Sequence, residues 1–297
     1  MREYLQGFFH DFSYPPEAAE TFLAAYDAIH ADPDVGKRFD SLIACYEQDK
    51  NCDVKPMIDE AGALSQVVSV HEYTGKLLLF LCMSKALKAY YQEEGLSIDI
   101  WFTSMCDLKY KAVECKLVHG VWGSFVCEWF IRFFRMTCFG FEKLQCELIP
   151  FKKNYEKNGV CLTPESVVIN VHIPRTGGKL DAESLKKSFA LAAAFFKEHD
   201  QLSQIVFVCA SWLLFPKHLE VLSPDSNLRR FISCFDIVNH GEYEDYEEVW
   251  RLFDKEYTGD AELLPQNTSL RRIYADWIRK GEKTGWGHGV YVYSEQG

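Results

Sequence analysis

The stretch VHIPRTGGKLDAESL, residues 171 to 185, joins a strand, a glycine loop and the start of a helix. Its β-branched residues end at Pro174, which fixes φ and stops the strand. Gly177 and Gly178 then allow backbone conformations that other residues avoid, and Asp181 stands where a helix N-cap is expected. This order is typical of folds that bind a phosphate group. It predicts an α/β unit and a candidate anion site.

The loop after Pro174 has the components of such a site. Backbone N–H groups of a glycine loop and of a first helical turn bind anions, and basic side chains here add positive charge. The candidate ligand-binding residues are Arg175, Thr176, Gly177, Gly178 and Lys179. Asp181 and Glu183 already offset the helix dipole, so the alternative is a capped turn with solvated basic residues. The loop matches neither a P-loop nor a dinucleotide motif.

Composition narrows the class of protein. The 297 residues, 48% hydrophobic and 25% charged, predict two globular domains. A net charge of -11 gives no general attraction to nucleic acid or to an anionic membrane. The 11 cysteines form no C-x-x-C pair, which favours buried reduced thiols and no metal site. The apolar run at 76–87 is too short to span a bilayer, so a soluble, cytoplasmic protein is expected.

The apolar pattern changes period near residue 117. Before it, apolar residues recur at helical spacing, as in EAAETFLAAYDAIH at 17–30, and Asp32-Pro33-Asp34 breaks the pattern. Residues 1–117 therefore predict an all-α domain of about five helices. Residues 118–297 alternate strand and helix patterns and predict a mixed α/β domain, which makes the fold class α+β.

Several elements of the second half can be assigned by position. We expect two antiparallel strands, FVCEWFIRFFRMTCF and FEKLQCELIPF, around a turn near Gly140. The helix DAESLKKSFALAAAFFKEH should pack Leu185 and Phe189 on a sheet, with its lysines in water. Further elements are expected as follows: strands at 166–174, 204–214, 235–240 and 288–293, and helices at 217–236, 247–253 and 268–281.

Three stretches resemble a group of bacterial acyltransferase-domain proteins that join a helical N-terminal domain to a GNAT-like (N-acyltransferase) C-terminal domain. They are FEKLQCELIPF at 141–151, INVHIPRTGGKLDAESLKKSF at 169–189 and LLPQNTSLRRIYADWIRKGEKTGWGHGV at 263–290. The resemblance implies that the glycine loop grips the pyrophosphate of acetyl-CoA or another acyl-CoA. It also implies transfer of an acyl group, acetyl foremost, to a small-molecule amine.

Acyl transfer to an amine needs a group that takes up a proton. Strand alternation puts Asn170 and His172 on one face, and His172 is the titratable residue nearest the loop. Glu147 lies in an expected neighbouring strand. His172 and Glu147 are therefore the catalytic candidates. The alternatives are a hydrogen-bonded core histidine and an ion pair of Glu147 with Arg132 or Arg135.

Two departures from the family pattern favour another function. Leu180 stands where the family's loop has glycine or alanine, and no tyrosine follows the second strand as a thiolate acid. His218, Ser223 and Ser226 are the available substitutes, and Ser223 before Pro224 is expected to cap a helix. Cys209 and Ser211 are expected to pack. A non-catalytic small-molecule-binding or interaction protein on the same scaffold is thus the alternative.

Overall fold

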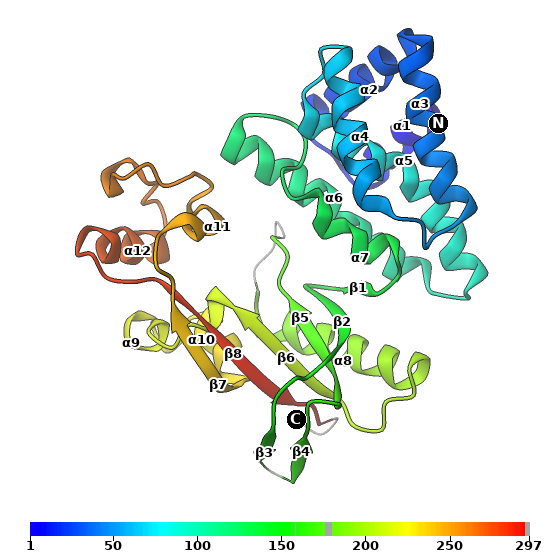
Figure 1. Ribbon diagram of the computed structural model, residues 1–297. Helices are drawn as coiled ribbons and strands as arrows, with labels where there is room; N and C mark the ends of the chain where they lie inside the picture. Colours follow the sequence, from blue (N-terminus) through cyan, green and yellow to red (C-terminus); the bar gives the residue numbers. More distant parts are fainter. Residues whose placement is uncertain (158, 176–179, 295–297) are drawn as a thin grey trace. The chain divides into compact units, whose positions relative to one another are not determined.

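The computed structural model describes residues 1–157, 159–175 and 180–294 (Figure 1). The chain divides into two compact units, Met1–Gly140 and Phe141–Gly297. The first unit is helical and the second is built on β-sheet, which confirms the predicted α+β class. The change of period predicted at 117 lies near the end of a long helix, and the helical unit continues for some 20 residues beyond it.

The helical unit follows the apolar periodicity of the sequence. Its elements are α1 (Arg2–Asp11), α2 (Pro16–Ala31), α3 (Pro33–Gln48), α4 (Val54–Val67), α5 (Glu72–Glu93), α6 (Ile98–His119), the 3-10 turn η1 (Cys127–Phe130) and α7 (Ile131–Phe134). The predicted break before α3 is confirmed. Asp32 caps that helix, since its Oδ1 accepts the N–H groups of Asp34 and Val35 at 3.0 and 3.1 Å.

Helix α5 forms the centre of the helical unit. Every residue from Leu77 to Ser84 is fully buried, so this apolar run is core. Among the described residues, no helix is long and apolar enough to cross a membrane.

The expected strand at 125–139 is wrong over most of its length. Residues 127–134 form η1 and α7, and only β1 (Cys138–Phe141) is strand. Phe130, Phe133 and Phe134 are all buried, and their spacing of three and four residues is that of one helix face. The turn expected near Gly140 falls at Glu142, whose φ is 54°.

The second unit is built on a mixed sheet. Its elements are β2 (Leu144–Pro150), β3 (Tyr155–Lys157), β4 (Val160–Leu162), β5 (Val167–His172), α8 (Ala182–His199), β6 (Val206–Ser211), η2 (Trp212–Leu214), α9 (His218–Val221), α10 (Asn227–Ser233), β7 (Asp236–Glu242), η3 (Glu247–Val249), α11 (Trp250–Phe253), η4 (Ala261–Leu263), α12 (Ser269–Arg279) and β8 (Gly285–Val292). The strand order is β1-β2-β5-β6-β8-β7, and β3 and β4 form a separate two-stranded sheet. Strands β5 and β6 are parallel, whereas β2 with β5, β6 with β8 and β7 with β8 are antiparallel.

The single helix expected at 217–236 is also wrong. The chain forms the short helices α9 and α10, with Pro224 in the segment between them. Proline has no N–H to continue a helix, which explains the interruption. The cap of α10 is Ser226, not Ser223, since the Ser226 hydroxyl accepts the N–H of Arg229.

Two apolar clusters stabilise the second unit. One covers the sheet with side chains of β4 and of the chain before β3, and it comprises Phe151, Val160, Leu162, Val168, Val206, Val208 and Val290. The other joins α11 to α12 and comprises Val249, Phe253, Ala261, Leu264, Tyr274, Ala275, Trp277 and Ile278. The first cluster fills one end of a sheet face, and the second supports the segment that contacts Arg175.

Candidate functional site

The two faces of the sheet differ in what covers them. Helix α8 packs on one face through Leu185, Phe189, Ala192 and Phe196, as predicted from its periodicity. The ring of Phe189 lies 4.9 Å from that of Phe207 on β6. Side chains alternate along each strand, so the residues between those that face α8 belong to the opposite face. The candidate site lies on that opposite face.

Pairing between strands places the polar residues of this face side by side. Glu147 of β2 is opposite Asn170 of β5, and Asn170 is opposite Val208 of β6. Further along, Ala210 of β6 is opposite His288 of β8. Ala210 is exposed, whereas Val208 is buried in the apolar cluster. The face is therefore apolar at one end and polar at the other.

The structure brings the two predicted catalytic residues into direct contact. His172 Nε2 lies 2.7 Å from Glu147 Oε1. Asn170 Nδ2 donates to the same carboxylate oxygen at 3.2 Å and lies 3.1 Å from His172 Nε2. The side chains of His172 and Glu147 are 23% and 15% exposed. A carboxylate held this way fixes the orientation of an imidazole.

Strands β5 and β6 are paired over only part of their length. Their parallel ladder joins Ile169 to Phe207 and Asn170 to Val208, although the strands run on to His172 and Ser211. Both strands are described in full, and their carboxyl-terminal residues lie beyond the last β5–β6 pair. In open α/β sheets, ligands bind at the carboxyl ends of strands. The Glu147–His172 pair lies at such an end.

The glycine loop begins directly after this point. Thr176, Gly177, Gly178 and Lys179 lie outside the described residues. Asp181 caps α8 as predicted, since its Oδ1 accepts the Ser184 N–H at 2.9 Å, and this backbone bond lowers the pKa of Asp181.

The remaining described loop candidate, Arg175, contacts an acidic residue far along the chain. Its Nη2 donates to Asp254 Oδ2 at 2.9 Å, and the two side chains form an ion pair.

The glycine-rich end of the chain has a packing function that sequence reasoning missed. A Cβ on Gly287 would lie 2.1 Å from the Leu214 carbonyl oxygen, and one on Gly289 would lie 2.6 Å from Phe235 Cβ. Glycine every second residue therefore lets β8 lie against η2 and the end of α10. The residues between them, His288 included, face the same side as Glu147. Burial lowers the pKa of His288. The sequence signal for this close packing was glycine at every second position, at Gly285, Gly287 and Gly289.

The other sequence candidates are structural. Cys209 is fully buried, which raises the pKa of its thiol to about 12. The Ser211 hydroxyl accepts the Leu213 N–H and starts η2. His218 is fully buried, and its Nε2 lies 2.6 Å from the Tyr274 hydroxyl. The packing interpretation of Cys209 is confirmed, Ser211 is half-buried and caps η2, and the buried ring of His218 cannot reach a ligand at the sheet face. No group of three or more His, Cys, Asp or Glu among the described residues is arranged to hold a metal ion.

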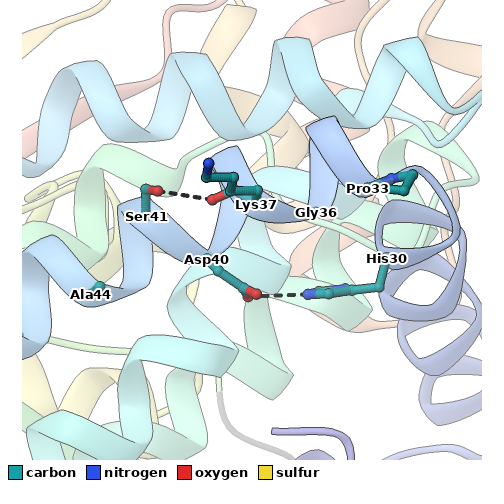
Figure 2. Close-up of a pocket in the computed structure, with 7 residues that line it drawn as sticks. All are labelled: His30, Pro33, Gly36, Lys37, Asp40, Ser41 and Ala44. Carbon is teal, nitrogen blue, oxygen red and sulfur yellow. Dashed lines mark hydrogen bonds and ion pairs between the residues drawn. The ribbon is translucent and has the colours of Figure 1, made fainter.

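A second histidine–carboxylate pair lies in the helical unit. His30 at the end of α2 and Asp40 on α3 line a hollow of about 510 Å³ together with Pro33, Gly36, Lys37, Ser41 and Ala44 (Figure 2). The His30 Nε2 lies 3.0 Å from Asp40 Oδ1, and its Nδ1 lies 2.8 Å from the carbonyl oxygen of Tyr26. Both ring nitrogens of His30 thus lie within hydrogen-bond distance of oxygen atoms of the helical unit.

Comparison with known proteins agrees with both units. Residues 138–291 match the family model of the GNAT-like C-terminal domain, and residues 3–136 match that of the N-acyltransferase N-terminal domain. No curated protein matches the sequence.

Solved structures of low sequence identity share the fold. One is an acyltransferase in complex with decanoyl-CoA and teicoplanin, with a TM-score of 0.75 and 18% identity over 97% of this chain and 87% of that one. Another is an acyltransferase mutant in complex with octanoyl-CoA, with a TM-score of 0.74 and 19% identity over 98% of this chain and 88% of that one.

Proposed function

The chain belongs to the family with the GNAT-like C-terminal domain, and on that premise we propose that it is an acyl-CoA-dependent N-acyltransferase acting on a small-molecule amine. The observation that carries the proposal is the contact between Glu147, Asn170 and His172 at the carboxyl end of β5. Groups that transfer protons must lie where a ligand can reach them, and this contact lies where the parallel β5–β6 ladder stops.

The chemistry assigns a task to each residue. The amine nitrogen forms a bond to the thioester carbonyl carbon, the carbon–sulfur bond breaks, and one proton leaves the nitrogen. The His172–Glu147 pair takes up that proton, with Asn170 holding the carboxylate in place. The departing CoA thiolate takes up one proton, so protons balance over the reaction. The net charge of the chain is -11, and a negative protein attracts cations, which supports a cationic acceptor.

The glycine loop is the proposed site of the CoA pyrophosphate. Arg175, Thr176, Gly177, Gly178 and Lys179 would supply backbone N–H groups and positive charge ahead of α8. The solved relatives were obtained with decanoyl-CoA and octanoyl-CoA, which supports a CoA thioester as co-substrate here.

We propose acetyl as the acyl group. Beyond Asn170, the sheet face is filled by Val168 and Val208 under Phe151 and Leu162, each at most 5% exposed. This packing leaves the polar end of the face for a short acyl group. A medium-chain group, as in the solved relatives, would require displacement of these side chains.

Calorimetric titration with CoA, acetyl-CoA, octanoyl-CoA and decanoyl-CoA tests binding. We expect binding that is lost in Gly178→Trp and retained in Gly7→Trp, because Gly7 lies on an exposed face of α1 with no atom within 4 Å of an added Cβ. Absence of binding to every thioester by the folded wild-type protein would overturn the proposal.

Turnover is then measured with a panel of primary amines. Released CoA should be followed by chromatography, since Cys45 and Cys161 are exposed and react with thiol reagents. Acylated amine with acetyl-CoA as the best donor is the expected result. Binding of acyl-CoA without transfer to any amine would favour a non-catalytic binding protein on this scaffold.

A further inference from the structure

Arg271 connects three parts of the α11–α12 segment. Its Nε donates to the carbonyl oxygen of Leu252 at 2.8 Å, and its Nη1 donates to Asn267 Oδ1 at 2.9 Å. Its Nη2 donates to the carboxylate of Asp254. Asn267 and Arg271 belong to the stretch at 263–290 that resembles the family. These contacts therefore connect that stretch to the end of α11.

Asp254 also holds the first basic residue of the glycine loop. Arg175 Nη2 donates to Asp254 Oδ2 at 2.9 Å, across 79 positions of sequence. One carboxylate therefore joins the loop after β5 to helix α12. Among the loop candidates, Arg175 is the one whose side-chain contacts the structure describes.

The end of α11 fixes the backbone conformation of Asp254. This residue ends α11 in the left-handed region at φ 58°, and its N–H donates to the Trp250 carbonyl oxygen at 2.8 Å. Phe253 beside it is fully buried in the cluster that joins α11 to α12. The buried core beside Asp254 therefore fixes the position of its carboxylate, which binds Arg175.

The charged groups around Asp254 are partly buried. Asp254 and Arg271 are each 14% exposed and Arg175 is 35% exposed. Burial lowers the pKa of Arg271, yet a guanidinium remains charged at neutral pH. The two guanidinium groups share the carboxylate of Asp254. Without the carboxylate, two partly buried guanidinium groups would repel each other.

We propose that Asp254 is a positioning residue for acyl-CoA, which holds Arg175 where it contacts the CoA pyrophosphate. This inference rests on the proposed function. Asp254 does not itself touch the co-substrate; it orders the Arg175 side chain before binding, which removes part of the entropic cost of ordering it in the complex.

The variant Asp254→Asn removes the charge and keeps the shape. We expect its KM for acyl-CoA to rise about 10-fold to 100-fold, the range for loss of a charge-assisted hydrogen bond, with kcat little changed. The matched control is Asp276→Asn, an Asp of α12 that pairs with Lys280 at the surface, which should leave KM unchanged.

A truncated thioester separates positioning from a general structural defect. The acyl thioester of N-acetylcysteamine lacks the pyrophosphate, so Asp254→Asn should use it as well as the wild-type protein does. Equal losses with both thioesters would show a structural role and overturn the proposal. An unchanged KM for acyl-CoA would also overturn it. If Asp254→Asn does not fold, Arg175→Gln provides the same comparison from the more exposed partner.

Limited trypsin digestion gives a readout that needs no ligand. Cleavage after Arg175 requires that its side chain leave Asp254, so Asp254→Asn should be cut there faster than Asp276→Asn. Wild-type protein that binds no acyl-CoA would overturn the proposed function, whichever way digestion turns out. Binding in the wild type, together with equal digestion of both variants, would overturn this inference alone.

Discussion

The His30–Asp40 pair of the helical unit and the His172–Glu147 pair of the second unit look alike by distance and differ in surroundings. In the helical unit His30 Nε2 lies 3.0 Å from Asp40, and in the sheet unit His172 Nε2 lies 2.7 Å from Glu147. Asp40 is 58% exposed, whereas Glu147 is 15% exposed. Distance alone therefore does not distinguish a candidate site from a surface ion pair.

The partners of each pair make the distinction. His30 bonds a helix carbonyl through its second nitrogen and stacks on Tyr26 with ring centroids 4.0 Å apart. The His30 ring is therefore held in place by contacts at the end of α2. The carboxylate of Glu147 instead accepts an amide donor from Asn170, beside strand ends that lie beyond the β5–β6 ladder. A proton-transfer group needs both a fixed carboxylate and a place for a ligand.

The largest effect expected is on turnover. His172→Gln should lower kcat of acyl transfer by about 100-fold to 10,000-fold, the usual range for loss of a general base. His30→Gln is the matched control and should change kcat less than about twofold, because an exposed ion pair contributes little. Steady-state rates with acyl-CoA and an amine check both. Equal losses in the two variants would remove the distinction between the pairs.

A third histidine predicts a pH dependence of stability. Burial lowers the pKa of His218 from 6.5 to about 4, because it penalises the charged ring, and the hydrogen bond with the Leu213 carbonyl oxygen offsets only part of this effect. Between pH 6.5 and 4 the unfolded chain holds more protons at this site. The free energy of unfolding should therefore decrease as the pH is lowered from 6.5 to 4, by at most about 3 kcal/mol. Above pH 6.5, His218 should add no pH dependence.

Urea unfolding at pH 7, 5.5 and 4.5 measures that dependence. His218→Gln should flatten it, and Asn239→Ala, which removes no titratable group from an exposed position of β7, should not. The same slope in His218→Gln and in the wild type would contradict the assignment.

A smaller effect is expected at the amide beside the catalytic pair. Asn170→Ala removes the hydrogen bond to Glu147 Oε1 and should lower kcat about 10-fold to 100-fold, in keeping with one lost bond to a charged group. Asn239→Ala, on an exposed position of β7, is the control in the same sheet. A kcat for Asn170→Ala equal to that of the wild type would show that the amide does not support the pair.

The smallest effect concerns the helical pair. Asp40→Asn should lower the free energy of unfolding by less than about 1 kcal/mol at neutral pH, since exposed ion pairs rarely contribute more. Chemical unfolding in low and high salt measures it, and salt should reduce the difference. A loss of several kcal/mol would show that the pair is structurally more important than its exposure indicates.

Local patterns predicted the parts of the fold that depend on neighbours in sequence. Asp181 as a helix cap, the buried face of α8 and the shared face of Asn170 and His172 follow from turn chemistry and from periods of 3.6 and 2. The same logic failed at 125–139, where aromatic content suggested a strand although Phe130, Phe133 and Phe134 have helical spacing.

The rest depended on pairing between distant segments. Glu147 meets His172 only because β2 and β5 pair in one register, and Arg175 meets Asp254 across 79 positions. No local pattern fixes such a register. His288 was missed as a site residue although it lies in the expected strand at 288–293, because the pairing of β8 with β6 determines which face it occupies.

The central claim is that Glu147 handles a proton of acyl transfer rather than holding the fold or the co-substrate. Its most direct test is Glu147→Gln, with the dissociation constant for acyl-CoA measured by calorimetry and kcat measured on the same preparation. The predicted result is an unchanged dissociation constant and a kcat lower by about 100-fold or more. A variant that binds acyl-CoA and transfers the acyl group at the wild-type rate would contradict it.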